Sequence, residues 1–402
     1  MKVLVVGDYY PDIGGVTQYT HNLAVGLIRN NIKVHILQTR AGKSYYSKSY
    51  TIFRLPASLL RKMYMILKGL PYIVYLLLYY PPIFLNFKTL LNTIFLGGML
   101  SELLRKNTYH LVHSNHLALR SLIACIVAHK HRVPCVVTSH GYDTERPESV
   151  TEFLLRKATI ELADRVITLT RTKFYMLNSL YGNSNKFIVI PNFINCYFDN
   201  YEELLYAKKR TKNAMGLNDK FVILYLGRLV KEKGIYDIIK LSKLIQNISS
   251  RYYIFIVGDG PELQQLKAEI EGGSLKGVYL LPAVAEDEKR KILLASDIIL
   301  LPTYHSETFP TVLIEGMGHG LVPVSYRFRG VEEIVISGVN GFVVERGDVN
   351  AMAGIVLRLE DDIMYYSLSV NAFRTSKSFC LNSVVHKIID IYKDLLRKYE
   401  VV

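Results

Sequence analysis

The stretch Asp297-Ile-Ile-Leu-Leu-Pro302, with the loop after it and the run Thr311-Val-Leu-Ile-Glu315, decides the fold of this chain. The first part is a short apolar run with the length of a buried strand. From Thr311 onward the pattern predicts a helix, which places Glu315 one turn into it, while Glu307 lies in the loop before it. A strand that leads through a loop into a helix is the repeating unit of a parallel sheet with helices on both faces.

The same alternation extends along the chain in two series, separated by the polar stretch Asn195–Asp219, which we interpret as a linker. A length of 402 residues fits two domains of about 200 residues each. The sequence therefore predicts an α/β protein with two facing, doubly wound, Rossmann-like domains and an active site in the cleft between them. The predicted strands are Lys2–Gly7, Lys33–Thr39, His110–Asn115, Cys135–Ser139, Val166–Thr170 and Phe187–Pro191, then Phe221–Gly227, Tyr252–Gly258, Val278–Leu281, Asp297–Pro302, Val322–Tyr326 and Gly341–Val344.

We expect the N-terminal domain to span residues 1–195 and the C-terminal domain residues 196–375. We expect a last helix over residues 376–402, and the sequence does not decide whether this helix crosses back to the N-terminal domain. The first residues read as a buried strand rather than a signal peptide, so we expect a cytoplasmic protein. The cysteines show no metal-type spacing, which indicates a reducing compartment and no disulfide framework. They are Cys125, Cys135, Cys196 and Cys380.

Positive charge is concentrated in the first half of the chain. The formal net charge is +14, and Glu102 is the only acidic residue between Ile13 and Tyr142. Residues 40–132 carry thirteen Lys or Arg against that one Glu, a net of +12. Such asymmetry favours a polyanionic partner: nucleic acid, anionic lipid or a phosphorylated substrate.

The segment Ser58–Met99 is basic and strongly apolar at once. Pro71 and Pro81-Pro82 leave only nine residues uninterrupted between them, which is far short of a bilayer span. We therefore expect residues from about 57 to 100 to lie on a membrane surface rather than cross it, the alternative being that they pack inside the protein. This predicts a peripheral protein on the inner face of the cell membrane.

Several small or polar groups follow predicted strands, at the end where ligands bind in such sheets. Gly14-Gly15 opens the first helix, where a bare backbone and a helix N-terminus favour a phosphate. His140 follows another strand, and we expect His113 and His116 past a further strand end. A structural histidine or a plain tight turn would explain each feature equally well.

The second series carries the sharper signals. Arg228 and Lys233 lie on the loop after its first strand, where two cations can neutralise a diphosphate. Gly258 begins the turn Gly258-Asp-Gly-Pro after the next strand. Glu307 and Glu315 flank a helix N-terminus, which offers amide groups to a phosphate while carboxylates accept hydrogen bonds from sugar hydroxyls.

These motifs, in this order, resemble glycosyltransferase family 4, the retaining enzymes of the GT-B fold. The resemblance covers residues 1 to about 345. Individually the motifs are modest, and it is their order and spacing that are specific. They are Gly14-Gly15, His140-Gly141, Arg228 with Lys233-Gly234, Gly258-Asp-Gly-Pro, Glu307-x7-Glu315 with Phe309 between, and Gly338-Val-Asn-Gly341-Phe-Val.

The resemblance implies a metal-independent hexosyltransferase that uses a nucleotide-diphosphate-sugar as donor and needs no cofactor. It implies that Arg228 and Lys233 hold the diphosphate, with Gly14 and Gly15 leaving room for it. Glu307 would bind the donor sugar, Glu315 the ribose, and His140 the sugar near its reacting face. Further donor contacts would come from Gly258 and from the backbone of Phe309, Pro310, Thr311 and Val312; Pro310, where many members have Gly, supplies no N–H.

The resemblance and the charge together indicate transfer to a glycan or lipid-linked acceptor in polysaccharide or glycolipid synthesis. An epimerase or phosphorylase on the same scaffold remains an alternative, as does a sugar-binding protein with an inactive site. A basic nucleic-acid-binding protein is a third alternative, but the basic half lacks stacking aromatics on a sheet, so no nucleic acid is expected. We find no Asp-x-Asp motif and expect no metal site.

Overall fold

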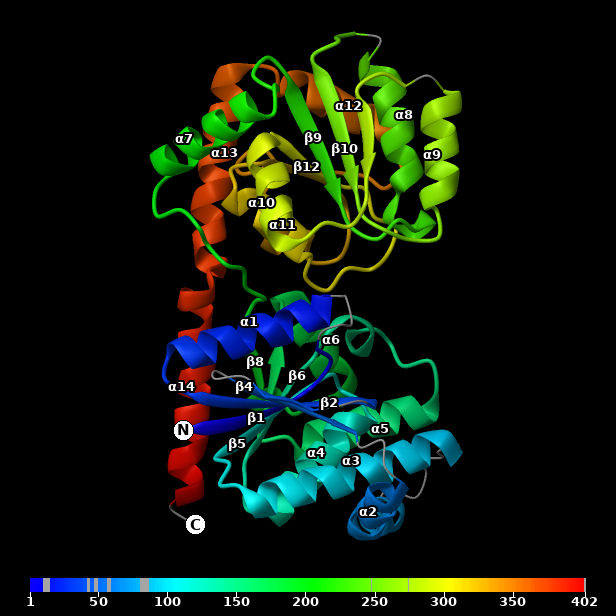
Figure 1. The fold of residues 1–402 in the computed structure, drawn as a ribbon, viewed down its shortest axis with the longest axis vertical. Coiled ribbons are helices and arrows are strands. Elements are labelled where there is room, and N and C mark those ends of the chain that lie inside the picture. Colours follow the sequence, from blue (N-terminus) through cyan, green and yellow to red (C-terminus); the bar gives the residue numbers. More distant parts are fainter. Residues whose placement is uncertain are drawn as a thin grey trace. The chain divides into compact units, whose positions relative to one another are not determined.

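The structure is a computed structural model that describes residues 1–9, 15–41, 44–46, 50–55, 59–79, 87–246, 248–273 and 275–400. The chain divides into two compact units, which are described one at a time. Unit 1 comprises residues 1–193 and 381–402, and unit 2 comprises residues 194–380. Each unit contains a parallel sheet with helices packed on it (Figure 1).

In the described part of unit 1 the sheet has eight strands in the order β3-β4-β2-β1-β5-β6-β7-β8, all parallel except β3. All six predicted strands are present, and β3 and β4, which the pattern did not predict, extend one edge. The strands are β1 (Lys2–Val6), β2 (Lys33–Ala41), β3 (Tyr45–Tyr46), β4 (Tyr50–Leu55), β5 (Leu111–Asn115), β6 (Cys135–Thr138), β7 (Arg165–Thr168) and β8 (Phe187–Val189).

Both faces of this sheet are covered by helices, as its strand sequences require (Figure 1). On β1, Leu4 and Val6 contribute to one core, whereas Val3 and Val5 contribute to the other, because successive side chains of a strand point to opposite faces. The helices are α1 (Gly15–Arg29), α2 (Leu59–Tyr79), α3 (Phe87–Lys106), α4 (Leu119–Lys130), α5 (Val150–Leu162), α6 (Arg171–Tyr181) and α14 (Leu381–Glu400), with short 3₁₀ turns η1 (Gly141–Thr144) and η2 (Ser184–Lys186).

The basic, apolar segment forms α2 and α3, which pack closely against each other. A Cβ atom on Gly69 would lie 1.9 Å from the carbonyl oxygen of Ile94, and one on Gly98 would lie 2.1 Å from that of Met65. Only glycine permits this approach of the two backbones. No helix in the described part of the chain is long and apolar enough to cross a membrane.

In the described part of unit 2 the sheet has six strands in the order β11-β10-β9-β12-β13-β14. Every strand predicted in the second series is present. The strands are β9 (Phe221–Leu226), β10 (Tyr252–Val257), β11 (Val278–Leu281), β12 (Ile298–Leu301), β13 (Val322–Tyr326) and β14 (Phe342–Val344). The helices are α7 (Tyr201–Ala214), α8 (Ile235–Gln246), α9 (Leu263–Gly272), α10 (Glu286–Ala295), α11 (Thr311–Gly318), α12 (Val349–Arg358) and α13 (Asp362–Ser376), with 3₁₀ turns η3 (Lys231–Lys233), η4 (Val331–Glu333) and η5 (Lys377–Phe379).

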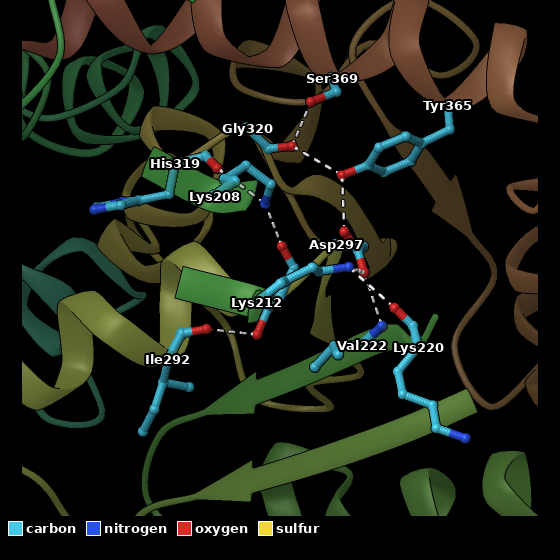
Figure 2. Close-up of polar contacts among 11 residues, drawn as sticks. Lys208, Lys212, Lys220, Val222, Ile292, Asp297, His319, Gly320, Tyr365 and Ser369 are labelled. Carbon is cyan, nitrogen blue, oxygen red and sulfur yellow. Dashed lines mark hydrogen bonds and ion pairs between the residues drawn. The ribbon is translucent and has the colours of Figure 1, made fainter. Parts of the chain in front are cut away.

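The stretch Asn195–Asp219 is not an open linker, so that interpretation is wrong. It contains α7, which a buried polar network fixes to unit 2 (Figure 2). Lys208 donates to the carbonyl of Ser296, and Lys212 Nζ lies 2.5 Å from Asp297 Oδ2. Asp297 directly precedes β12, so the network lies at the amino ends of the strands, where it supports the fold rather than a ligand.

The expectation that the cysteines are unpaired is wrong for two of them. Cys196 and Cys380 form a disulfide, with their Cα atoms 5.5 Å apart. Cys125 and Cys135 are free and buried in unit 1, where their sulfur atoms lie 2.8 Å apart. The disulfide lies within unit 2, next to both points at which the chain passes between the units.

Candidate active site

Two loops at the carboxyl end of the sheet of unit 2 bring the predicted cations and Glu307 together. One loop runs from β9 through η3, and the other follows β12. The amide N–H groups of Tyr304 and His305 both donate to the carbonyl of Glu232, which joins the loops. Gly234 has a φ of +68°, and a Cβ there would lie 1.8 Å from the carbonyl oxygen of Pro302. Only glycine fits at this crossing.

Lys233 and Glu307 form an ion pair across the two loops. Their side chains are 23% and 15% exposed, so the pair is partly shielded from water but still accessible. Thr303 Oγ1 donates to the same carboxylate oxygen at 3.4 Å. The arrangement places the Lys233 ammonium group next to a carboxylate that can accept hydrogen bonds from sugar hydroxyls. The contribution of Thr303 was not predicted from the sequence.

Arg228 and Gly258 lie at the same end of the sheet. The Arg228 side chain is exposed, and its carbonyl accepts a hydrogen bond of 2.7 Å from the Tyr225 hydroxyl. A Cβ on Gly258 would lie 1.9 Å from the carbonyl oxygen of Gly227, so the turns after β9 and β10 approach each other closely.

The helix α11 begins at Thr311, where the pattern predicted it. Leu313 N–H donates to the carbonyl of Pro310 at 3.1 Å, so the amides of Thr311 and Val312 precede the first hydrogen bond of the helix. Those two amides remain as donors for an anion, as expected at a helix N-terminus. Phe309 is buried and packs against Phe379, which fixes the loop in front of the helix.

Glu315 lies on α11 and pairs with a lysine that sequence reasoning missed. Lys289 Nζ is 3.3 Å from both carboxylate oxygens of Glu315 and 2.9 Å from Glu286. Burial raises the pKa of Glu315, and Lys289 opposes that rise. Although burial disfavours its charged form, Glu315 and Glu286 raise the pKa of Lys289. The i,i+3 pairing of Glu286 with Lys289 on α10 is the sequence signal that was available.

In unit 1, His140 directly follows β6 and is buried next to Tyr19, with ring centroids 4.5 Å apart. Its Nε2 lies 3.4 Å from Asn115 Oδ1, whose amide group in turn donates to Thr20. Because Asn115 therefore presents its oxygen, Nε2 of His140 carries the proton and Nδ1 is the acceptor. Burial, with His116 and His113 nearby, lowers the pKa of His140 well below its usual value, so the ring is neutral at neutral pH.

Other sequence expectations in unit 1 have mixed outcomes. His113 does not lie past a strand end; it lies inside β5, bonded to Thr138 and Tyr392, and burial lowers its pKa to about 3. It is a structural residue. Gly15 begins α1, and no described atom lies within 4 Å of the position that a Cβ would take. Gly14 lies outside the described residues.

Within the described ranges, no three His, Cys, Asp or Glu side chains gather closely enough to hold a metal ion. Unit 2 contains most of the predicted donor site, namely Arg228, Lys233, Gly258, Glu307 and the start of α11. Gly15 and His140 are in unit 1.

Two parallel, doubly wound sheets in sequential units define the GT-B class of fold. Sucrose-phosphate synthase from Thermosynechococcus elongatus has this fold, with a TM-score of 0.77 at 19% identity and coverage of 99% of both chains. Anabaena HepE, solved in complex with UDP and glucose, gives a TM-score of 0.71 at 18% identity over 98% of this chain and 100% of that one.

Family profiles identify the particular group of enzymes. The profile of Glycosyltransferase Family 4 matches residues 13–198, and that of Glycosyl transferases group 1 matches residues 207–374. The chain belongs to this family and is a glycosyltransferase that uses a nucleotide-sugar.

Two curated relatives illustrate the similarity. An uncharacterized glycosyltransferase of Methanocaldococcus jannaschii is 25% identical over 98% of this chain and 99% of its own. The UDP-Gal:α-D-GlcNAc-diphosphoundecaprenol α-1,3-galactosyltransferase of Escherichia coli is 27% identical over 74% of this chain and 78% of its own.

Proposed function

We propose that this glycosyltransferase transfers a sugar, with retention of its anomeric configuration and without a metal ion, to a hydroxyl of a glycan or lipid-linked acceptor at an anionic membrane surface. The observation that carries the donor half is the Lys233–Glu307 pair beside the start of α11. A cation and free helix amides suit a diphosphate, and a neighbouring carboxylate suits sugar hydroxyls.

Each donor contact has a proposed role. Lys233 and Arg228 hold the diphosphate together with the amides of Thr311 and Val312. Glu307 accepts hydrogen bonds from the donor sugar, and Glu315, steadied by Lys289, accepts them from the ribose. His140, neutral and fixed by Asn115, contacts the sugar near its reacting face.

The chemistry follows from charge development. As the bond from the sugar to the diphosphate breaks, the sugar becomes oxocarbenium-like and the leaving group gains negative charge. Fixed cations and helix amides stabilise that charge without reorganisation, in the way a metal ion would. The acceptor hydroxyl attacks the same face of the sugar and passes its proton to the departing phosphate, which gives retention.

The test begins with a thermal-shift screen of the full chain against nucleotide-sugars, because a bound donor stabilises the fold by mass action. The donor that shifts the melting temperature is then incubated with lipid-linked and glycan acceptors, and NMR identifies the anomeric configuration of the product. Release of an epimerised nucleotide-sugar without transfer would refute the proposal in favour of an epimerase.

Membrane docking is supported by the surface of α2. One face of this helix is buried and consists of Met65, Tyr72, Ile73 and Leu76. The opposite face exposes a second apolar stripe. Lys62 and Lys68, on the same helix, are partly exposed and can approach anionic headgroups. The exposed stripe comprises Met63, Tyr64, Leu67, Leu70, Val74, Tyr75 and Leu78. A helix with a wide apolar face next to lysines suits the plane of a membrane interface.

Docking also fits the acceptors of relatives. The Escherichia coli relative is named for a diphosphoundecaprenol-linked acceptor. A lipid-linked acceptor of that kind would be within reach of a protein held at the membrane.

We expect binding to anionic vesicles at low salt that weakens with salt and leaves a salt-resistant remainder from inserted side chains. The double substitution Leu67→Glu with Leu78→Glu should abolish the salt-resistant binding, because these side chains are 68% and 70% exposed and would be the ones inserted into the membrane. The matched control is Ile363→Glu on α13, which is 84% exposed and should bind as the parent does. Absence of binding to anionic vesicles at low salt, measured by co-sedimentation, would end the docking proposal.

A further inference from the structure

Unit 1 contains a cavity of about 600 Å³ at the carboxyl ends of its central strands. Asp8 follows β1, His116 follows β5 and Asp143 follows β6, and all three line it. The volume falls in the range of small-molecule sites, and this end of a parallel sheet is where ligands bind. Apart from Gly15 and His140, the described residues that we assign to the donor lie in unit 2, and none of the described donor residues lines this cavity.

The charges that line the cavity disfavour an anionic ligand. Arg120 donates to Asp8 at 2.8 Å, and Arg156 is bonded to the carboxylate of Glu152. Both guanidinium groups are therefore already neutralised. With the Asp143 carboxylate and with histidine counted as neutral, the lining carries three negative and two positive charges. A carboxylate or phosphate would be repelled, whereas hydroxyl groups find both donors and acceptors.

A histidine–aspartate pair forms part of the cavity wall. Asp143 is buried; its Oδ2 accepts the Leu117 N–H at 2.5 Å, and its Oδ1 has no hydrogen-bond partner among the described residues. His116 Nδ1 lies 3.9 Å from that Oδ1, and its side chain is 27% exposed. A buried carboxylate oxygen without a donor is unfavourable, so a small rotation of His116 toward it would stabilise the site.

The backbone at His116 is also held in a strained conformation. Its φ is +75°, in the left-handed region that non-glycine residues seldom adopt, and its N–H donates to the Thr138 carbonyl at 2.7 Å. Such strain persists where the surrounding structure enforces it, and it is concentrated at binding sites. The His116 ring also contacts that of His140, with centroids 5.5 Å apart, which connects the cavity to the residue that we assign to the donor sugar.

We infer that this cavity binds the acceptor as an uncharged, hydroxyl-bearing sugar ring, and that His116 Nε2 accepts a hydrogen bond from an acceptor hydroxyl while Asp143 holds the opposite ring nitrogen. The inference rests on the proposed function and narrows it, because small carboxylic acids and phosphorylated polyols would be excluded as acceptors. His116 orients the sugar ring through a hydroxyl other than the attacking one; the proton of the attacking hydroxyl still leaves to the departing phosphate of the donor.

Two substitutions test the pair without disturbing the fold. His116→Asn keeps a residue that tolerates positive φ, and Asp143→Asn keeps an oxygen for the Leu117 N–H. Each should raise KM for the acceptor about 5- to 100-fold, the cost of one hydrogen bond at a buried site, and leave nucleotide affinity and melting temperature unchanged. His386→Asn, on the exposed face of α14, is the matched control and should match the parent.

The assay uses the full chain, the donor found by thermal shift, and three probes: uncharged octyl glycosides, L-malate and inositol phosphate. Saturation-transfer NMR should detect glycoside binding that both variants weaken, and only glycosides should receive sugar. Transfer to malate or inositol phosphate would overturn the inference and leave the proposed function intact. An unchanged acceptor KM in both variants would also overturn the inference and leave the proposed function intact. If no nucleotide-sugar shifts the melting temperature, the proposed function fails, and this inference fails with it.

Discussion

Substitution of Glu307 should move nucleotide affinity and transfer rate in opposite directions, whereas substitution of Lys233 should lower both. Glu307 holds the Lys233 ammonium group, so a donor diphosphate must compete with Glu307 for that charge. Glu307→Gln removes the competitor, so affinity for the nucleoside diphosphate alone should rise. The same change removes the acceptor for the sugar hydroxyls, so transfer should fall. Lys233→Ala should lower both.

The partial burial of the Lys233–Glu307 pair determines how much free energy their interaction contributes. Exposed pairs contribute about 0.2–1 kcal/mol, and breaking a fully buried pair costs about 3–5 kcal/mol. With side chains 23% and 15% exposed, this pair falls between them, at about 1–3 kcal/mol. We therefore expect Glu307→Gln to tighten diphosphate binding by about 5- to 100-fold, since 1.4 kcal/mol is a factor of ten. Lys233→Ala should slow transfer about 100- to 1,000-fold, the usual effect of losing one fixed charge stabiliser.

Isothermal titration with the nucleoside diphosphate and initial-rate assays measure the two quantities separately. The double variant completes a cycle that isolates the coupling between the two side chains. Lys267→Ala is the control, because Lys267 is 62% exposed on α9 and should behave as the parent. If Glu307→Gln weakened diphosphate binding and left transfer unchanged, the assigned roles of the pair would be wrong.

Three further predictions concern the nucleotide, the metal and the disulfide. Glu315→Gln should weaken binding of the nucleoside diphosphate by calorimetry, since Glu315 is assigned to the ribose; unchanged affinity would refute that role. Transfer should survive EDTA, and loss restored by magnesium or manganese would refute metal independence. Maleimide should label two cysteines in the denatured, unreduced protein and four after reduction, and Cys380→Ser should lower the unfolding free energy by about 2–4 kcal/mol, since the bond closes a loop across 184 residues. Four labelled cysteines without reductant would refute the bond.

The strands were predictable because they are buried on both faces and read as uninterrupted apolar runs. Ile298-Ile-Leu-Leu301, for example, is wholly buried in β12. The strand β4, which lies beside the short edge strand β3, was missed because Tyr50-Thr-Ile-Phe-Arg-Leu55 mixes polar and apolar residues. The helix α7 was missed because its mean composition is polar, and only Leu204 and Lys208 are buried on it.

The candidate site divides in the same way. Glu307 and Lys233 were identifiable because each lies in a loop after a predicted strand, and parallel strands bring such loops to one edge. Their ion pair was not identifiable, because contact between residues 74 positions apart depends on the glycine crossing at Gly234. Lys289 was missed for a related reason: it comes from a helix side chain and no strand-end motif marks it.

The C-terminal helix shows how far the support of a site can lie from it in sequence. Tyr392 on α14 lies 2.5 Å from His113 Nδ1, and the other nitrogen of His113 lies 2.7 Å from the Thr138 hydroxyl. That hydroxyl is 3.1 Å from Tyr19, whose ring packs against His140. Burial raises the pKa of Tyr19 and lowers that of His113, so the whole chain of contacts stays uncharged around neutral pH. Because a neutral network needs no counter-ion, α14 can fix the position of His140 from within the core, and truncation of that helix would disturb unit 1 rather than the donor loops.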